Sequence, residues 1–179
     1  MSSRTSPVWT SKRWQSRQRP DTGVTEQDPE ARLQHALDLA YRYLGRRERT
    51  ALEVGRHLES KGVEPATTAA ALAELERQGY VDDVRYAQMF AEDRRKLDGW
   101  GTERIERRLA QVGVNPEIVA SVVTRRGPGE ELRDALDVLE RRIAEPPQDD
   151  RGRERALGLL VRRGYDLDTA YAAVRAFTA

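Results

Sequence analysis

The chain has 179 residues, 38% of them hydrophobic and 34% charged, and its formal net charge is +1 at pH 7. This length suits one ordinary domain or several small helical modules, and the near-neutral charge argues against non-specific DNA packaging. The sequence contains no cysteine, which excludes disulfides and thiol chemistry. It also has no run of 18 apolar residues and no apolar segment near the N-terminus, so we expect a cytoplasmic protein without a membrane segment.

Residues 1–27 form the first segment, which mixes basic residues with Ser, Thr, Gln and Pro. Trp9 and Trp14 are its only large apolar side chains, so we expect a disordered basic tail that cannot form a core. Such a segment could contact single-stranded DNA by charge and stacking. The favoured interpretation is a solvated tail that the function does not require.

From residue 28 onward, the sequence contains signals for helix starts and apolar stripes with helical spacing. Asp28 and Asp82 stand at plausible helix starts, and Thr50 with Glu53 has the spacing of a capping box. The first helix of each unit carries apolar residues at helical spacing: Leu33, Leu37 and Leu44, then Val84, Phe90 and Leu97, then Leu132, Leu139 and Ile143. No segment shows the alternation typical of a strand, so the fold class is all-α.

An internal repeat organises this helical part of the chain. Gly62, Gly113 and Gly164 lie 51 residues apart, as do Leu58, Leu109 and Leu160. Each glycine follows a predicted helix, where a left-handed residue commonly ends it, and a polar residue that could start the next helix follows shortly after. The repeat predicts three tandem three-helix units, similar to helix-turn-helix motifs, at residues 28–81, 82–126 and 127–179.

No motif in the sequence indicates catalysis. A phosphate-binding glycine loop, a zinc-protease motif and a nucleophile arrangement are all missing from the sequence. Gly99-Trp100-Gly101 is interpreted as a connection between helices, and Asp82-Asp83 as helix-capping residues. We therefore expect a protein that is not an enzyme and that uses no cofactor or metal.

Basic residues are the remaining candidates for a site. All but three of the 31 basic residues are arginine, the side chain suited to bidentate contacts with phosphate and carboxylate. Arg104, Arg107 and Arg108 should share one helix face. The alternative is a solvated face on which Glu103 and Glu106 offset these charges. The candidate binding residues are Arg46, Arg47, Arg49, Arg56, Arg94, Arg95, Lys96, Arg104, Arg107 and Arg108.

Residues 36–123 resemble the RecX family of recombination regulators. The most specific run is 72–90, which contains Leu-Ala-Glu-Leu at 72–75 and Gly-Tyr-Val-Asp-Asp at 79–83. The third unit agrees more loosely, through Gly152, Leu160 and Gly164. The resemblance implies tandem three-helix repeats, in agreement with the repeat found above, and it does not extend to the basic tail.

The resemblance also implies a function. A RecX-like protein binds the RecA recombinase filament on single-stranded DNA, in its helical groove, and inhibits ATP hydrolysis, strand exchange and co-protease activity. We expect a monomer that reaches single-stranded DNA through RecA or directly. The alternative is a helix-turn-helix transcription regulator, although the third helices, which start at Pro65 and Pro116, carry no base-reading side chains near their starts.

Overall fold

In a computed structural model of the chain, residues 28–124 and 129–179 are described, and they form helices and no strand. The prediction about residues 1–27 lies outside the described residues. The helices are α1 (Pro29–Leu44), α2 (Ala51–Ser60), α3 (Pro65–Arg77), α4 (Asp83–Asp98), α5 (Thr102–Gln111), α6 (Pro116–Thr124), α7 (Glu130–Arg142), α8 (Asp150–Arg163) and α9 (Leu167–Phe177). The predicted all-α class is confirmed.

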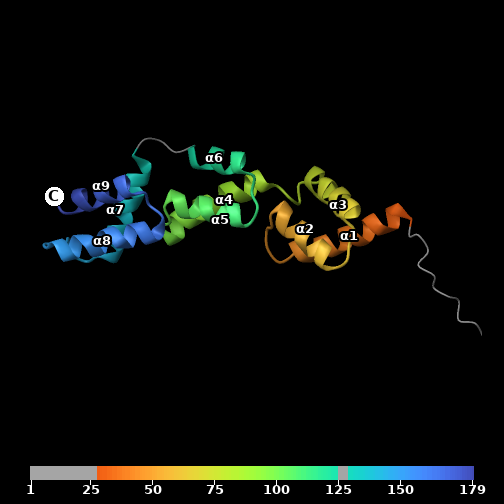
Figure 1. Cartoon of the computed structure of the whole chain (residues 1–179), viewed down its shortest axis with the longest axis horizontal. Coiled ribbons are helices and arrows are strands. Elements are labelled where there is room, and N and C mark those ends of the chain that lie inside the picture. Colours follow the sequence, from red (N-terminus) through yellow and green to blue (C-terminus); the bar gives the residue numbers. More distant parts are fainter. Residues whose placement is uncertain (1–27, 125–128) are drawn as a thin grey trace, which may run out of the picture.

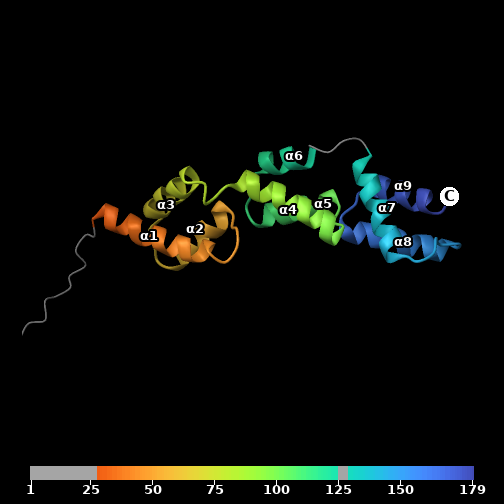
Figure 2. The same ribbon diagram turned by 180° about the vertical axis from the view of Figure 1, so that it is seen from behind.

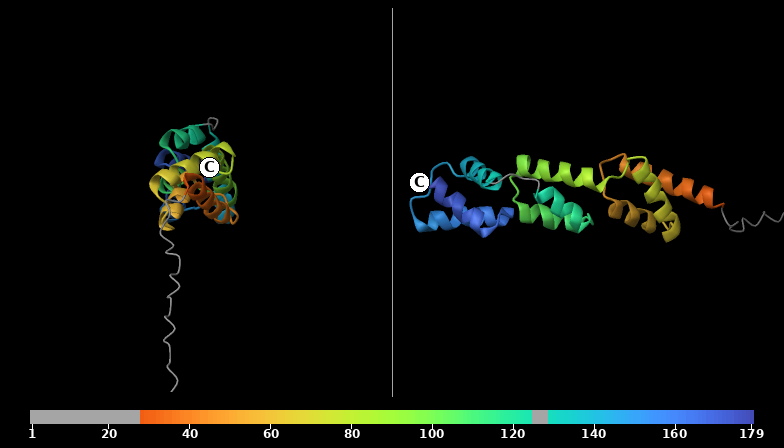
Figure 3. Two further views of the ribbon diagram at one scale, coloured as in Figure 1. Left: turned by 90° about the vertical axis from the view of Figure 1, so that its right-hand side faces the viewer. Right: turned by 90° about the horizontal axis from the view of Figure 1, so that it is seen from above.

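The helices form three groups of three that follow one another along a single axis (Figure 1). Helices α1–α3 lie at one end, α4–α6 in the middle and α7–α9 at the end that holds the C-terminus, and the view from behind shows the same row (Figure 2). In the end-on view the three groups overlap, and in the view from above they form an elongated row (Figure 3). We call these groups unit 1, unit 2 and unit 3.

Side-chain caps fix where most of these helices begin. Asp28, Asp82, Asp149 and Asp166 each accept a hydrogen bond from a backbone N–H in the first turn of the helix that follows. The predicted capping box of α2 is also present, because Thr50 and the Glu53 side chain exchange hydrogen bonds with each other's backbone N–H. These starts therefore depend on interactions within a few residues.

Each unit has its own small hydrophobic core. In unit 1 the core includes Leu37, Val54, Leu58, Ala71 and Leu75. In unit 2 it includes Ala87, Ala91, Ile105, Leu109 and Val119. In unit 3 it includes Ala135, Leu139, Leu160, Tyr165 and Ala173. The repeated leucines Leu58, Leu109 and Leu160 are fully buried, one in each core, so the 51-residue repeat is a repeat of core positions.

The repeated glycines follow the second helix of each unit. Gly62, Gly113 and Gly164 have φ angles of 81°, 83° and 87°, which is the left-handed region that penalises a Cβ.

Within the described part of the chain, no helix is long and apolar enough to span a bilayer.

Candidate functional site

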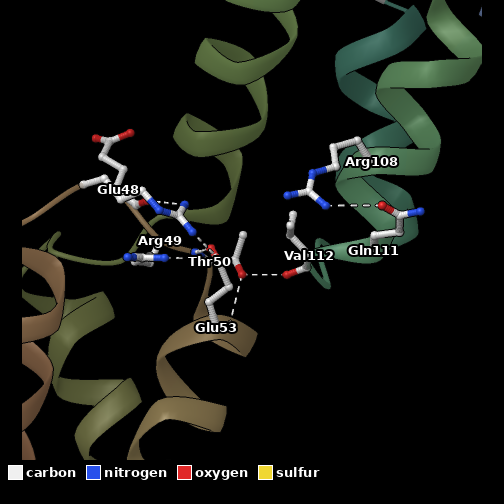
Figure 4. Close-up of polar contacts among 8 residues, drawn as sticks. Glu48, Arg49, Thr50, Glu53, Arg108, Gln111 and Val112 are labelled. Atoms are coloured by element: carbon white, nitrogen blue, oxygen red, sulfur yellow. Dashed lines mark hydrogen bonds and ion pairs between the residues drawn. The ribbon is translucent and has the colours of Figure 1, made fainter.

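Units 1 and 2 meet where α2 begins and α5 ends. The Thr50 hydroxyl donates a 2.6 Å hydrogen bond to the Val112 carbonyl, and both residues are buried (Figure 4). The Ala51 N–H, in the first turn of α2, donates a 2.9 Å hydrogen bond to the Asp83 carboxylate at the start of α4. These two hydrogen bonds link the units, and we call this contact the first joint.

Units 2 and 3 repeat that contact, and three of its four residues are shifted by 51 positions, whereas the acceptor Glu131 stands 48 residues after Asp83. The Gly101 N–H donates a 2.9 Å hydrogen bond to the Arg163 carbonyl, in the places that Thr50 and Val112 take at the first joint. The Thr102 N–H donates a 2.9 Å hydrogen bond to Glu131 in the first turn of α7, as Ala51 does to Asp83. This second joint shows that the repeat encodes the contact between units as well as their cores.

Glycine makes the close approach at the second joint possible. A Cβ on Gly101 would lie 2.4 Å from the carbonyl carbon of Gly164, and a Cβ on Gly164 would lie 2.5 Å from the Arg104 backbone nitrogen. Such distances leave no room for any side chain. The interpretation of Gly99-Trp100-Gly101 as a simple connection was therefore incomplete, because Gly101 is also the contact point with unit 3.

The carboxyl group of Asp83 is partly buried at the first joint. Burial, and after it the negative charges of Asp82 and Glu53, raises the pKa of Asp83, while the hydrogen bond from Ala51 opposes that shift. The sequence predicted Asp82 and Asp83 as caps of their own helix. Asp82 has that role, whereas Asp83 caps α2 of the preceding unit.

Two candidate arginines of unit 1 are engaged within the protein at the first joint. Arg47 pairs with Glu53 at 2.6 Å, and Arg49 lies 4.2 Å from the centre of the Tyr43 ring and 3.5 Å from the Glu53 carboxylate. Figure 4 shows Arg49 and Glu53 of unit 1 facing the segment that carries Arg108 and Val112 of unit 2. Arg49 of unit 1 and Arg108 of unit 2 thus lie on opposite sides of the same joint.

Tyr86 of α4 lies within the electrostatic influence of both units at the same joint. Burial, followed by the charge of Glu53, raises the pKa of Tyr86, whereas the positive charges of Arg47 and Arg108 work in the opposite direction. The joint therefore collects positive charge from α5 and from the loop before α2 around one phenol.

Most candidates at the end of α4 are also engaged. Arg94 forms an ion pair with Asp98 and lies 5.3 Å from the Phe90 ring centre, and Lys96 pairs with Glu92. Arg95 lines a groove between α4 and α7 that also contains carboxylates, among them Glu92 and Asp137. At the start of α5, Arg104 lies 4.1 Å from the Trp100 ring centre.

Four candidates present guanidinium groups to solvent. Arg46, Arg56, Arg107 and Arg108 are exposed, and among the described residues none of them forms an ion pair. Arg108 makes only a 3.3 Å hydrogen bond to Gln111. Since an arginine already paired with a carboxylate has less to offer a partner, these four are the candidates best able to contact an acidic or phosphate surface.

The ten candidates do not form one site. Arg47, Arg49 and Arg108 lie around the first joint, whereas Arg94 and Arg104 lie at the second, because α4 and α5 both run from one joint to the other. Arg142, Arg162 and Arg163 at the second joint were not among the predicted site residues. A sequence signal existed, since Arg162 and Arg163 are adjacent arginines directly before the repeated glycine Gly164. Among the described residues no group of His, Asp and Glu could hold a metal ion.

Fold and surface together define a class of protein: a row of three-helix units joined head to tail, with exposed arginines beside the joints. The family model described as RecX, first three-helix domain, matches residues 36–75, and the model described as RecX, second three-helix domain, matches residues 82–123.

Relatives and solved structures agree over most of the chain. It is 36% identical over 151 residues to the regulatory protein RecX of Xanthomonas campestris pv. campestris (strain B100), covering 84% of this chain and 88% of that one. To the regulatory protein RecX of Mycolicibacterium smegmatis it is 30% identical, covering 85% and 84%. The crystal structure of RecX from Lactobacillus salivarius superposes with a TM-score of 0.74 at 15% identity, covering 83% of this chain and 97% of that one. The chain belongs to the RecX family of regulatory proteins.

Proposed function

We propose that this chain binds the RecA filament on single-stranded DNA, lies along its helical groove, and inhibits ATP hydrolysis, strand exchange and co-protease activity. The family membership supports the choice of RecA as the partner. Binding takes place through the exposed arginines around α5, which contact acidic side chains of RecA and DNA phosphates.

One observation carries the choice of surface: the guanidinium groups of Arg107 and Arg108 are exposed and, among the described residues, without an ion pair, on a helix that runs between the two joints. The elongated row adds support (Figure 3), because a row of units can follow a groove over several subunits of a filament. The positive charge beside each joint suits a partner that combines protein and phosphate surfaces.

The test is inhibition of RecA ATP hydrolysis on single-stranded DNA by the double variant Arg107→Glu/Arg108→Glu. Two charge reversals at the centre of the interface should raise the concentration needed for half inhibition by at least about tenfold, which corresponds to about 1.4 kcal/mol. Inhibition by the parent protein should also require more protein as salt rises, because salt screens contacts with phosphates and carboxylates.

A matched control is the double variant Arg151→Glu/Arg155→Glu. Both residues are exposed on α8 in unit 3, and this variant changes the net charge by the same amount at a place away from α5. The control should inhibit nearly as well as the parent. Equal inhibition by the folded α5 variant and the parent would reject this surface, and equal losses in both variants would show that overall charge, and not α5, governs binding.

A further inference from the structure

The surface at the second joint has an open pocket of about 360 Å³ between units 2 and 3. Its lining includes Arg104 from α5, Arg142 from the end of α7, and Arg162 and Arg163 from the end of α8, together with Trp100 and Asp98. A second pocket of about 290 Å³ shares Arg142 and Arg163 and adds Arg141. We call the four arginines and Trp100 the joint pocket.

Positive charge in the joint pocket is not balanced by nearby carboxylates. Asp98, the one acidic residue in the lining, already forms an ion pair with Arg94, which lies outside the lining. Within residues 28–124 and 129–179, neither Arg142 nor Arg162 forms an ion pair. The C-terminal ends of α4, α7 and α8 contribute roughly half a negative charge each, so a surplus of roughly two positive charges remains.

Arg163 is the most constrained of these arginines. Its guanidinium donates a hydrogen bond to the Asp98 carbonyl, while its Nε is buried and has no partner among the described residues. Burial, and then the positive charge of Arg142, lowers the pKa of Arg163. Arg104 is also held in place, by a 3.2 Å hydrogen bond to the Arg162 carbonyl. Two of the guanidinium groups are therefore fixed before any ligand arrives.

Trp100 supports the arginines and does not offer a free face for a nucleobase. Arg104 covers its ring at 4.1 Å, Arg94 lies 5.7 Å from the ring centre, and Phe90 meets it edge to face at 6.0 Å. The chemistry of the pocket is therefore a set of converging guanidinium groups. Guanidinium forks match the oxygens of phosphoryl groups, with which they form paired, charge-assisted hydrogen bonds.

We propose that the joint pocket is a binding site for a phosphoryl group, supplied either by a nucleic-acid backbone or by a free nucleotide. The anion neutralises the surplus charge and bridges arginines from units 2 and 3. Because the ligand then contacts both units at once, its binding stabilises the second joint and couples phosphate binding to the angle between the units.

The experiment uses the full chain with Trp9→Phe and Trp14→Phe, which leaves Trp100 as the only tryptophan. Trp100 fluorescence and the melting temperature are followed during titration with inorganic pyrophosphate, ADP and an oligothymidylate, at constant ionic strength set with chloride. We expect a saturable fluorescence change and a rise in melting temperature with at least one of these probes. Saturation by pyrophosphate and ADP alone identifies a nucleotide site, and tighter saturation by the oligonucleotide identifies a backbone site.

The variants Arg142→Gln and Arg162→Gln distinguish a binding site from a structural cluster. Each substitution should lower the affinity for the anion by about tenfold. Without anion, each should leave the melting temperature unchanged or raise it, because like charges that repel one another are removed. Arg151→Gln on the exposed start of α8 is the control and should bind as the parent does. A linear response to every probe, or variants that bind as tightly as the parent, would overturn the proposal. Neither result depends on whether the chain inhibits RecA.

Discussion

The hydroxyl of Thr50 serves two elements at once. It accepts the N-terminal hydrogen bond from the Glu53 N–H of α2 and donates to the Val112 carbonyl across the first joint. Thr50→Val keeps the shape, but it removes the cap and leaves a buried carbonyl without its donor, so the free energy of unfolding should fall by about 1–3 kcal/mol. Urea denaturation measures this change.

Thr68→Val is the matched control for that prediction. Thr68 is also buried, yet its hydroxyl has no partner among the described residues. Removing an unpaired buried hydroxyl should leave the free energy of unfolding unchanged or increase it. Equal losses in the Thr50 and Thr68 variants would mean that the cross-joint hydrogen bond adds nothing beyond the cost of the substitution itself.

Asp83 and Asp166 should affect stability with opposite dependence on pH. The folded-state pKa of Asp83 is raised, mainly by burial, so the folded state holds its proton more tightly and stability falls as pH rises through that pKa. For Asp166, burial acts to raise the pKa, but hydrogen bonds from Thr169 outweigh it and lower the value, so its ionised form stabilises the fold above the unfolded pKa.

Unfolding of Asp83→Asn and Asp166→Asn between pH 3 and pH 7 tests these signs. Relative to the parent, Asp83→Asn should gain stability as pH rises, because asparagine still accepts the Ala51 hydrogen bond and carries no buried charge. Asp166→Asn should lose stability over the same interval. Parallel curves for the two variants would contradict the assigned environments.

At the scale of the elements, Gly62 and Gly113 end equivalent helices, but only Gly113 lies against the neighbouring unit. Comparing substitutions at these two positions therefore distinguishes the cost of backbone strain from the cost of disturbing the contact between units. Both glycines have positive φ, but a Cβ on Gly62 meets nothing within 4 Å, whereas one on Gly113 would lie 2.1 Å from the Leu52 side chain. Alanine should cost about 1–2 kcal/mol at Gly62. At Gly113 it should cost at least about 1 kcal/mol more, because Leu52 must move.

Thermal unfolding of Gly62→Ala and Gly113→Ala checks this difference. Two equal shifts in melting temperature would show that the glycines matter only as helix ends. A larger shift for Gly113→Ala would show that the first joint contributes to stability.

Helices were predictable from this sequence because their signals are local. The caps at Asp28, Thr50 and Asp82 and the apolar stripe with Leu58 at its centre each depend on residues within one or two helical turns. The joints were not predictable in the same way. The partner of Asp83 lies 32 residues away and that of Thr50 lies 62 residues away, and no helical periodicity relates the members of either pair.

The candidate site was predictable only in residue type. Sequence identified clusters of arginine, but whether each one is paired depends on the folded geometry, as it does for Arg47 with Glu53 at the start of α2. Arg142 and Arg163 converge only when α7 and α8 are folded against each other and docked onto unit 2. Packing within and between units therefore decides which arginines remain available to a partner.

At the scale of the whole molecule, the row has two ends that differ from its joints. At the unit 1 end, Gly62 has no neighbour of the kind that covers Gly113 and Gly164. At the unit 3 end, α8 begins with Asp149, whose carboxylate accepts a hydrogen bond from the Gly152 N–H of its own helix and, among the described residues, contacts no further unit.

The three cores should respond separately to damage, because the extensively packed helix pairs all lie within one unit and the joints consist mainly of hydrogen bonds. Leu139 is fully buried in unit 3, and Leu58 is fully buried in unit 1. Leu139→Ala should cost about 2–5 kcal/mol and speed amide hydrogen exchange in α7–α9 while exchange in α1–α3 stays near the parent rate. Leu58→Ala should give the reverse pattern. If either variant instead loses protection evenly from α1 to α9, the joints transmit stability along the whole row and the units unfold as one cooperative body.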